Sequence, residues 1–171
     1  MPNNLFIAGL PRSRTAWLSV FMSQSDIYFY HEAINDCHSI KEYRDKIKGF
    51  GDSSTGLVYL GVDIIQDSKV VIINKTDDQL KNCIDWCDHT YGMNSRDFIL
   101  DENDKLKKLK GLHVNQSDID SRLKEIWCYL VDTPWDDKYS MLTKLNIQVQ
   151  STSINEEAAR SLNESIQKNT Q

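Results

Sequence analysis

Four consecutive aliphatic residues, at positions 70–73, form the feature that most constrains the fold of this chain. A strand with one face in solvent alternates apolar and polar side chains, whereas this run is apolar at every position. Burial of both faces of a strand is typical of the middle of a parallel sheet that carries helices on both sides. A second short run, at residues 5–8, has the same character. The chain is therefore predicted to belong to the α/β class.

Segments with helical patterns alternate with these strands. Residues 76–79 match a capping box, and the apolar positions that follow recur on one helix face: Leu80, Cys83, Ile84 and Cys87. The remaining expected elements are helices at residues 13–22, 39–48, 95–111, 117–132, 136–145 and 153–167, and strands at 27–30 and 147–149. Residues 49–54 are expected to form a loop, after at most a very short strand, and residues 55–66 fit either helix or strand. This alternation predicts a three-layer parallel sheet flanked by helices and joined by right-handed crossovers.

Length and charge narrow the class of protein. A chain of 171 residues corresponds to roughly one domain. The net charge of -5 disfavours broad binding to nucleic acid or to anionic membranes, because such binding needs a basic surface. There is no apolar run of about 18 residues and no secretory signal pattern, and the four cysteines are scattered rather than spaced as a disulfide framework. These features predict a cytoplasmic protein that binds neither nucleic acid nor membranes.

The segment at residues 9–15 joins the first predicted strand to a helix. Unpaired N–H groups at a helix start, reached through a tight loop, form a cradle for a phosphate group. In the standard pattern G-x-x-x-x-G-K-[ST], starting from Gly9, Arg14 stands at the second glycine and Ala16 at the metal-binding hydroxyl. Arg12 supplies a cation inside the loop in place of the usual lysine. An anion site is expected here, although the match to an ATPase or GTPase is poor.

The stretch GLPRSRTAWL resembles the 5′-phosphosulfate loop of the sulfotransferase superfamily, which reads roughly P-[RK]-S-G-T-T-W-L. The resemblance implies a P-loop fold related to nucleotide kinases, with 3′-phosphoadenosine 5′-phosphosulfate (PAPS) as the sulfuryl donor and no metal requirement. The residues that would bind PAPS are Gly9, Arg12, Ser13, Arg14 and Thr15. Arg14 replaces a glycine: it is strained if its φ is positive, and it is a second anion ligand if its backbone is helical.

The rest of the resemblance lies at the ends of the later strands. It implies a catalytic base at Glu32 or His31, which follow the strand at 27–30 and would point to opposite faces. It also implies substrate contacts at Ser53 and Ser54. Lys75 and Cys83 occupy the positions of the arginine and serine that bind the 3′-phosphate in the family.

We therefore expect a sulfotransferase-like P-loop domain over residues 1–150, and a C-terminal amphipathic helix or tail over 151–171 that packs on this domain or on a protein partner. The expected reaction transfers a sulfuryl group from PAPS to an unidentified hydroxyl or amine. A nucleotide kinase-like phosphotransferase and a non-catalytic nucleotide-binding or structural protein are the alternatives. Cys83, Cys87 and His89 are residue types that bind zinc. A fourth ligand is not evident, so no metal is expected.

Overall fold

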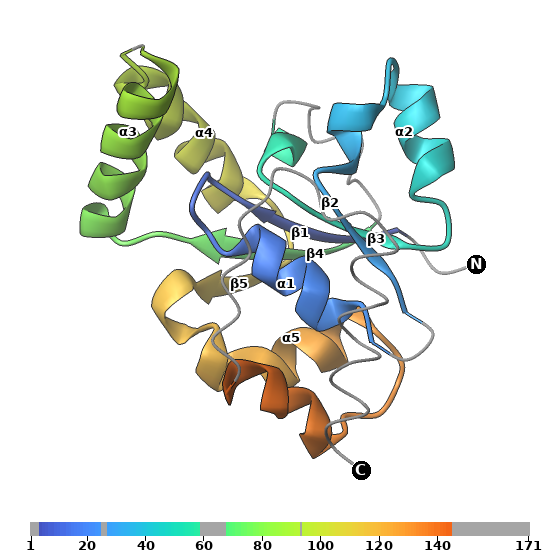
Figure 1. Ribbon diagram of the computed structural model, residues 1–171. Helices are drawn as coiled ribbons and strands as arrows, with labels where there is room; N and C mark the ends of the chain where they lie inside the picture. The colour runs from blue at the N-terminus through green and yellow to red at the C-terminus, as the bar shows by residue number, and fades with distance from the viewer. Residues whose placement is uncertain (1–3, 25–26, 59–67, 93, 145–171) are drawn as a thin grey trace.

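A computed structural model describes residues 4–24, 27–58, 68–92 and 94–144 of the protein (Figure 1). Its centre is a five-stranded parallel sheet with the strand order β2-β3-β1-β4-β5. The strands are β1 (Leu5–Gly9), β2 (Phe29–His31), β3 (Gly51–Ser54), β4 (Lys69–Asn74) and β5 (Leu112–Asn115). This order differs from both common doubly wound orders, 3-2-1-4-5-6 and 2-1-3-4-5.

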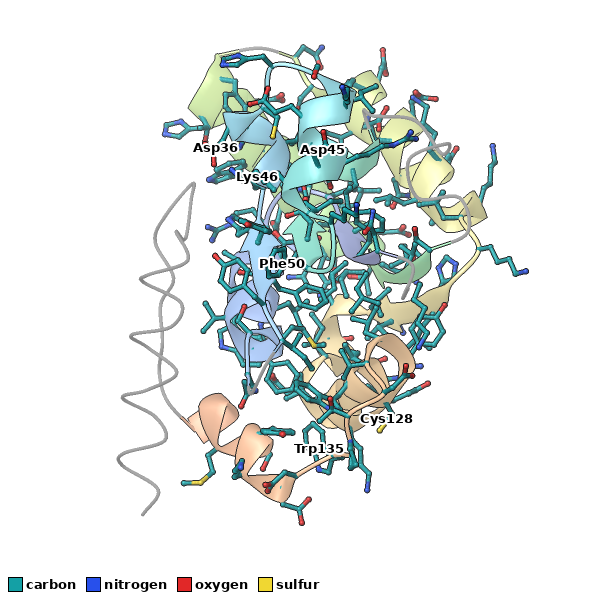
Figure 2. The ribbon with its side chains drawn as sticks, turned by 90° about the vertical axis from the view of Figure 1, so that its right-hand side faces the viewer. Asp36, Asp45, Lys46, Phe50, Cys128 and Trp135 are labelled. Atoms are coloured by element: carbon teal, nitrogen blue, oxygen red, sulfur yellow. The ribbon has the colours of Figure 1, made fainter. Side chains whose placement is uncertain are left out.

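Helices cover both faces of the sheet. They are α1 (Thr15–Met22), α2 (Ile40–Lys46), α3 (Asp77–Tyr91), α4 (Arg96–Lys108) and α5 (Leu123–Leu130). Figure 1 shows α1 and α5 on one face, and α2, α3 and α4 on the other. Figure 2 labels side chains of both layers, with Asp45 and Lys46 on the α2 side and Cys128 on the α5 side. The prediction of an α/β parallel sheet with helices on both sides is confirmed.

The two central strands are apolar at consecutive positions because each of their faces meets a different apolar cluster. Val70 and Ile72 belong to the cluster that includes side chains of α2, α3 and α4. Val71 and Ile73 belong to the cluster that includes side chains of α1 and α5. All four are at most 1% exposed. The prediction of a strand buried on both faces is therefore confirmed for β4.

The loop expected at residues 49–54 is wrong for its last four residues, because Gly51–Ser54 form β3. The strand has the sequence GDSS, and all four of its residues are buried. Polar side chains tolerate this position because each has a partner. Asp52 accepts from the Tyr43 hydroxyl at 2.7 Å, and Ser53 Oγ donates to the Thr15 carbonyl oxygen at 2.8 Å.

Three expectations for the second half of the chain also need correction. The helix expected to run to Gly111 ends at Lys108, and β5 follows where no strand was predicted. The helix expected at 117–132 is preceded by two 3-10 turns, η4 (Gln116–Asp118) and η5 (Asp120–Arg122), and α5 begins only at Leu123. The expected helix at 136–145 is the 3-10 segment η6 (Asp137–Lys144). The first of these errors matters most, because β5 places a further loop beside the candidate site.

The predicted capping box is present at the start of α3. Thr76 Oγ1 accepts from the Gln79 amide at 3.4 Å, and Gln79 Oε1 accepts from the Thr76 amide at 3.0 Å. Short 3-10 segments η1 (Ala33–Asp36) and η2 (Gly56–Val58) follow β2 and β3, and η2 occupies part of the ambiguous segment. The strand expected at 147–149 and the C-terminal segment 151–171 lie outside the described residues. Within the described part of the chain, no helix is long and apolar enough to cross a bilayer.

The topology creates a switch point at the carboxyl end of the sheet. Strands β1 and β4 are neighbours, but β1 leads into α1 on one face and β4 leads into α3 on the other. Adjacent loops therefore diverge between these two strands. In open α/β sheets, ligands bind at such a switch point, outside the carboxyl ends of the strands. The β1–α1 loop and the segments that follow β4, β2 and β3 are therefore the part of the fold where a ligand is expected to bind.

Candidate functional site

The β1–α1 loop has two residues in the left-handed backbone region. Arg12 has a φ of 67°, and Arg14, which precedes the first residue of α1, has a φ of 61° and a ψ of 21°. Residues other than glycine adopt this conformation at a cost of about 1–3 kcal/mol each. Successive amides in such turns form a concave group of N–H donors that suits an anion. Of the two alternatives for Arg14, the structure has the strained backbone.

No side chain of Arg14 or of the first turn of α1 accepts a hydrogen bond from the N–H groups at the start of this helix. Arg14 makes no side-chain cap, and the first turn of α1 contains no acidic residue. The positive end of the helix dipole and the first N–H groups thus have no acidic side chain of α1 beside them. This arrangement is the one expected of an anion cradle.

Ser13 has an unsatisfied hydroxyl in the middle of the loop. Its side chain is completely buried, and its Oγ has no hydrogen-bond partner. A buried hydroxyl without a partner costs about 1–3 kcal/mol, and such groups are few in folded proteins. Gly9 permits this position, since a Cβ there would lie 2.8 Å from Ser13 Cβ.

The two arginines of the loop extend away from it in different directions. The Arg12 guanidinium lies 5.9 Å from the centre of the Trp86 ring on α3. The Arg14 guanidinium lies 4.4 Å from the centre of the Trp17 ring and forms a 2.9 Å ion pair with Asp120. The two guanidinium groups therefore have different protein partners.

Lys75, directly after β4, reaches the loop backbone. Its Nζ donates to the Arg12 carbonyl oxygen at 3.2 Å and to Gln116 Oε1 at 2.7 Å. Burial lowers the pKa of Lys75, the nearby Cys83 opposes this effect in part, and Arg12 lowers the pKa further. The structure thus brings Lys75 together with the loop, at the switch point between β1 and β4.

Cys83, which the sequence pairs with Lys75, lies close enough to it for each group to shift the pKa of the other. It is 1% exposed and packs in the apolar cluster beneath α3. Burial raises the pKa of Cys83 to about 12, so its thiol is neutral at physiological pH. Cys83 is therefore part of the core, where it supports α3.

His31 and Glu32 lie close together, with His31 Nε2 3.9 Å from Glu32 Oε1. The alternation that predicted opposite faces does not apply, because Glu32 lies beyond β2 and has a φ of 56°. His31 Nε2 is also 3.4 Å from Thr15 Oγ1 at the start of α1. Both candidate bases therefore lie beside the β1–α1 loop.

The Glu32 carboxylate accepts four hydrogen bonds from the segment that ends β3. Its Oε1 accepts from the amide and hydroxyl of Thr55 at 2.6 and 2.7 Å, and its Oε2 accepts from Ser54 Oγ at 2.5 Å and the Gly56 amide at 3.3 Å. This network makes Glu32 an anchor between the ends of β2 and β3. Ser54 is occupied by this contact, and Ser53 by its bond to the Thr15 carbonyl oxygen.

His31 retains an unused ring nitrogen. Its Nδ1 is buried and has no hydrogen-bond partner. Burial lowers the pKa of His31, and the nearby Glu32 carboxylate opposes this effect in part. A neutral imidazole with a free ring nitrogen is able to accept a proton.

Sequence reasoning missed several residues around the site. Asp52 is fully buried, and burial raises the pKa of its carboxyl to about 7, although hydrogen bonds from Tyr43 and the Ala33 amide lower it in part. Gln116 and Asp120 contact the loop cations from the β5–α5 connection. Recognition of β5 would have placed these two residues at the carboxyl edge of the sheet.

The buried Asp52 gives a testable pH dependence. Because its folded pKa lies above the unfolded value of about 3.9, its protonated form stabilises the fold, and this contribution is lost as the pH rises toward 7. An asparagine keeps acceptors and donors for Ala33 and Tyr43 but does not ionise. Asp52→Asn is thus expected to gain about 2–3 kcal/mol of unfolding free energy relative to wild type between pH 5 and pH 8.

Urea unfolding of both proteins at several pH values measures this difference. Asp45→Asn, at an exposed position on α2, is the matched control and should show a nearly constant difference. A difference for Asp52→Asn that does not change with pH would contradict the prediction.

Among the described residues, no group of three or more His, Cys, Asp or Glu side chains is placed to hold a metal ion. A scan against models of known protein families found no match, and a search of the curated proteins found none either.

Proposed function

We propose that the β1–α1 loop binds the 5′-phosphosulfate group of PAPS, and that the protein transfers the sulfuryl group to a hydroxyl or amine acceptor. The observation that carries the proposal is the buried, unpartnered Ser13 hydroxyl between two left-handed residues at an uncapped helix start. A tetrahedral anion would accept from this hydroxyl and from the loop amides together.

Several features favour a sulfuryl donor over a nucleoside triphosphate. Ala16 provides no hydroxyl at the position that binds Mg²⁺ in the standard phosphate loop. A sulfuryl group carries less charge than a terminal phosphoryl group, so backbone donors and a few cations suffice to stabilise its transfer. The resemblance of residues 9–18 to the 5′-phosphosulfate loop points in the same direction.

The charged side chains have distinct proposed roles. Lys75 adds positive charge to the loop from β4, because its Nζ already lies against the Arg12 carbonyl oxygen. Thr15 and Arg12 complete the 5′ side of the site. Cys83 is given no direct ligand contact in this proposal, since its side chain is enclosed in the core beside Lys75.

His31 is the proposed general base, and Glu32 is its positioning residue. PAPS supplies an activated sulfuryl group, and His31 Nδ1 takes the proton that the acceptor hydroxyl loses as its oxygen bonds to sulfur and the bond to the 5′-phosphate breaks. The carboxylate of Glu32, 3.9 Å from the ring, stabilises the imidazolium that results. General-base assistance of this kind contributes about 10²–10⁴ in rate.

A nucleotide-binding protein without transferase activity is the second candidate. The four hydrogen bonds on Glu32, and the engagement of Ser53 and Ser54, favour it because these groups already have partners within the fold. If this second function is correct, the protein binds the nucleotide but transfers no sulfuryl group from PAPS to any acceptor.

Calorimetric titration tests the proposed function. The ligands are 3′-phosphoadenosine 5′-phosphate, 5′-AMP and ATP, each in EDTA and in Mg²⁺. We expect the 3′-phosphorylated ligand to bind best and independently of metal, with affinity lost in Arg12→Ala and retained in the control Arg44→Ala on α2. Preferential, Mg²⁺-dependent binding of ATP would overturn the proposal in favour of a kinase. If none of the three ligands bound, the proposal that the β1–α1 loop is a nucleotide site would be wrong.

A further inference from the structure

Two cations at the loop, Lys75 and Arg14, have partners in one short segment, the β5–α5 connection. Gln116, the first residue after β5, accepts from Lys75 Nζ at 2.7 Å. Asp120, four positions further along, pairs with Arg14 at 2.9 Å. These contacts come from η4 and η5, two consecutive 3-10 turns between the sheet and α5.

The two contacts differ in their effect on an incoming anion. Gln116 is neutral, so it fixes Lys75 beside the Arg12 carbonyl oxygen without cancelling its charge. Asp120 carries a charge of its own, so it occupies a guanidinium that an anion in the loop would otherwise attract. The pair lies at the surface, with side chains 33% and 59% exposed, and exposed pairs exchange partners at small cost.

We propose that the β5–α5 connection sets the anion affinity of the loop, with Gln116 positioning Lys75 and Asp120 competing with the ligand for Arg14. This inference rests on the proposed anion site but adds residues on which that proposal does not depend. Binding of a doubly charged anion then moves the Arg14 side chain from Asp120 to the ligand. The Arg14–Asp120 ion pair is therefore broken when the loop is occupied. Both residues are positioning residues, since each acts through a cation.

Asp120→Asn tests the competition. The variant should bind 3′-phosphoadenosine 5′-phosphate and inorganic pyrophosphate about two- to five-fold more tightly than wild type at low salt, with the gain shrinking at high salt. Asp118→Asn is the matched control, because it makes the same charge change on the same connection while Asp118 contacts Asn115 and Ser117 rather than Arg14. In an Arg14→Gln background, Asp120→Asn should have no further effect.

Gln116→Glu tests the second half of the inference. A carboxylate at this position neutralises Lys75, so binding of both ligands should weaken. The loss should disappear when Lys75→Met is already present. A simple structural role for Gln116 would instead lower stability in both backgrounds alike.

The outcomes separate this inference from the proposed function. Equal effects of Asp120→Asn and Asp118→Asn, or weaker binding by Asp120→Asn, overturn the inference alone. Equal binding of pyrophosphate and the nucleotide overturns the nucleotide assignment but leaves the inference in place. A wild-type protein that binds neither anion overturns both.

Discussion

Replacing Gly111 by alanine is expected to lower the free energy of unfolding by roughly 2–4 kcal/mol. A Cβ at this position would overlap the Val70 carbonyl oxygen and lie 2.6 Å from Ile72 Cδ1. The first of these atoms is backbone of the central strand β4, which is buried and paired on both sides. Relief of the clash therefore requires β5 to move away from β4, with loss of the pairing that begins at Leu112.

Chemical denaturation of Gly111→Ala against wild type measures the effect. Gly92→Ala is the matched control, because Gly92 has a φ of +63° but open space where a Cβ would lie. Its cost should be about 1 kcal/mol, from the left-handed backbone alone. Equal losses in the two variants would show that the close approach of Gly111 to β4 carries no special cost.

Ser13→Ala is expected to change stability and binding in opposite directions. The Ser13 hydroxyl is buried without a partner, so its removal should leave the free protein as stable as wild type or up to about 1 kcal/mol more stable. A hydrogen bond to a charged group contributes about 1.5–3 kcal/mol, so binding of 3′-phosphoadenosine 5′-phosphate should weaken about 10- to 100-fold. Groups that serve a ligand often reduce stability in this way.

The control for Ser13→Ala is Ser23→Ala, at the end of α1. The Ser23 hydroxyl has partners, since it donates to the Ser19 carbonyl oxygen at 2.7 Å and accepts from the Phe29 amide at 2.8 Å. Its removal should lower stability and leave nucleotide affinity nearly unchanged. A loss of stability in Ser13→Ala with unaltered binding would contradict the role given to the loop.

The strands that could be predicted from the sequence are those made of apolar side chains, which are buried whatever their partners are. Residues 70–73 are apolar throughout, and no other arrangement suits them as well as a central parallel strand. Strand β3 has no such signal, because Asp52 and Ser53 are stabilised by Tyr43 and by the Thr15 carbonyl oxygen, which lie elsewhere in the sequence. Strand β5 is only four residues long and follows a glycine that resembles a helix stop.

The candidate site was predictable where its residues directly follow a recognised strand. The loop after β1, His31 at the end of β2 and Lys75 after β4 meet at one edge of the sheet because parallel strands place their carboxyl ends together. The partners of these residues were not predictable. Gln116 and Asp120 follow the unrecognised strand β5, and a sequence alone does not show that Ser13 would lack a hydrogen bond.

The proposed function depends above all on an anion held in the β1–α1 loop by its amides and the Ser13 hydroxyl. Amide nuclear magnetic resonance spectra, recorded while 3′-phosphoadenosine 5′-phosphate is added in EDTA, report on these groups one by one. We expect the largest saturable shifts at the amides of Ser13, Arg14 and Thr15, and smaller shifts in Ser13→Ala at equal ligand concentration. Saturable binding whose shifts lie away from this loop, with Ser13 unaffected, would contradict the proposal.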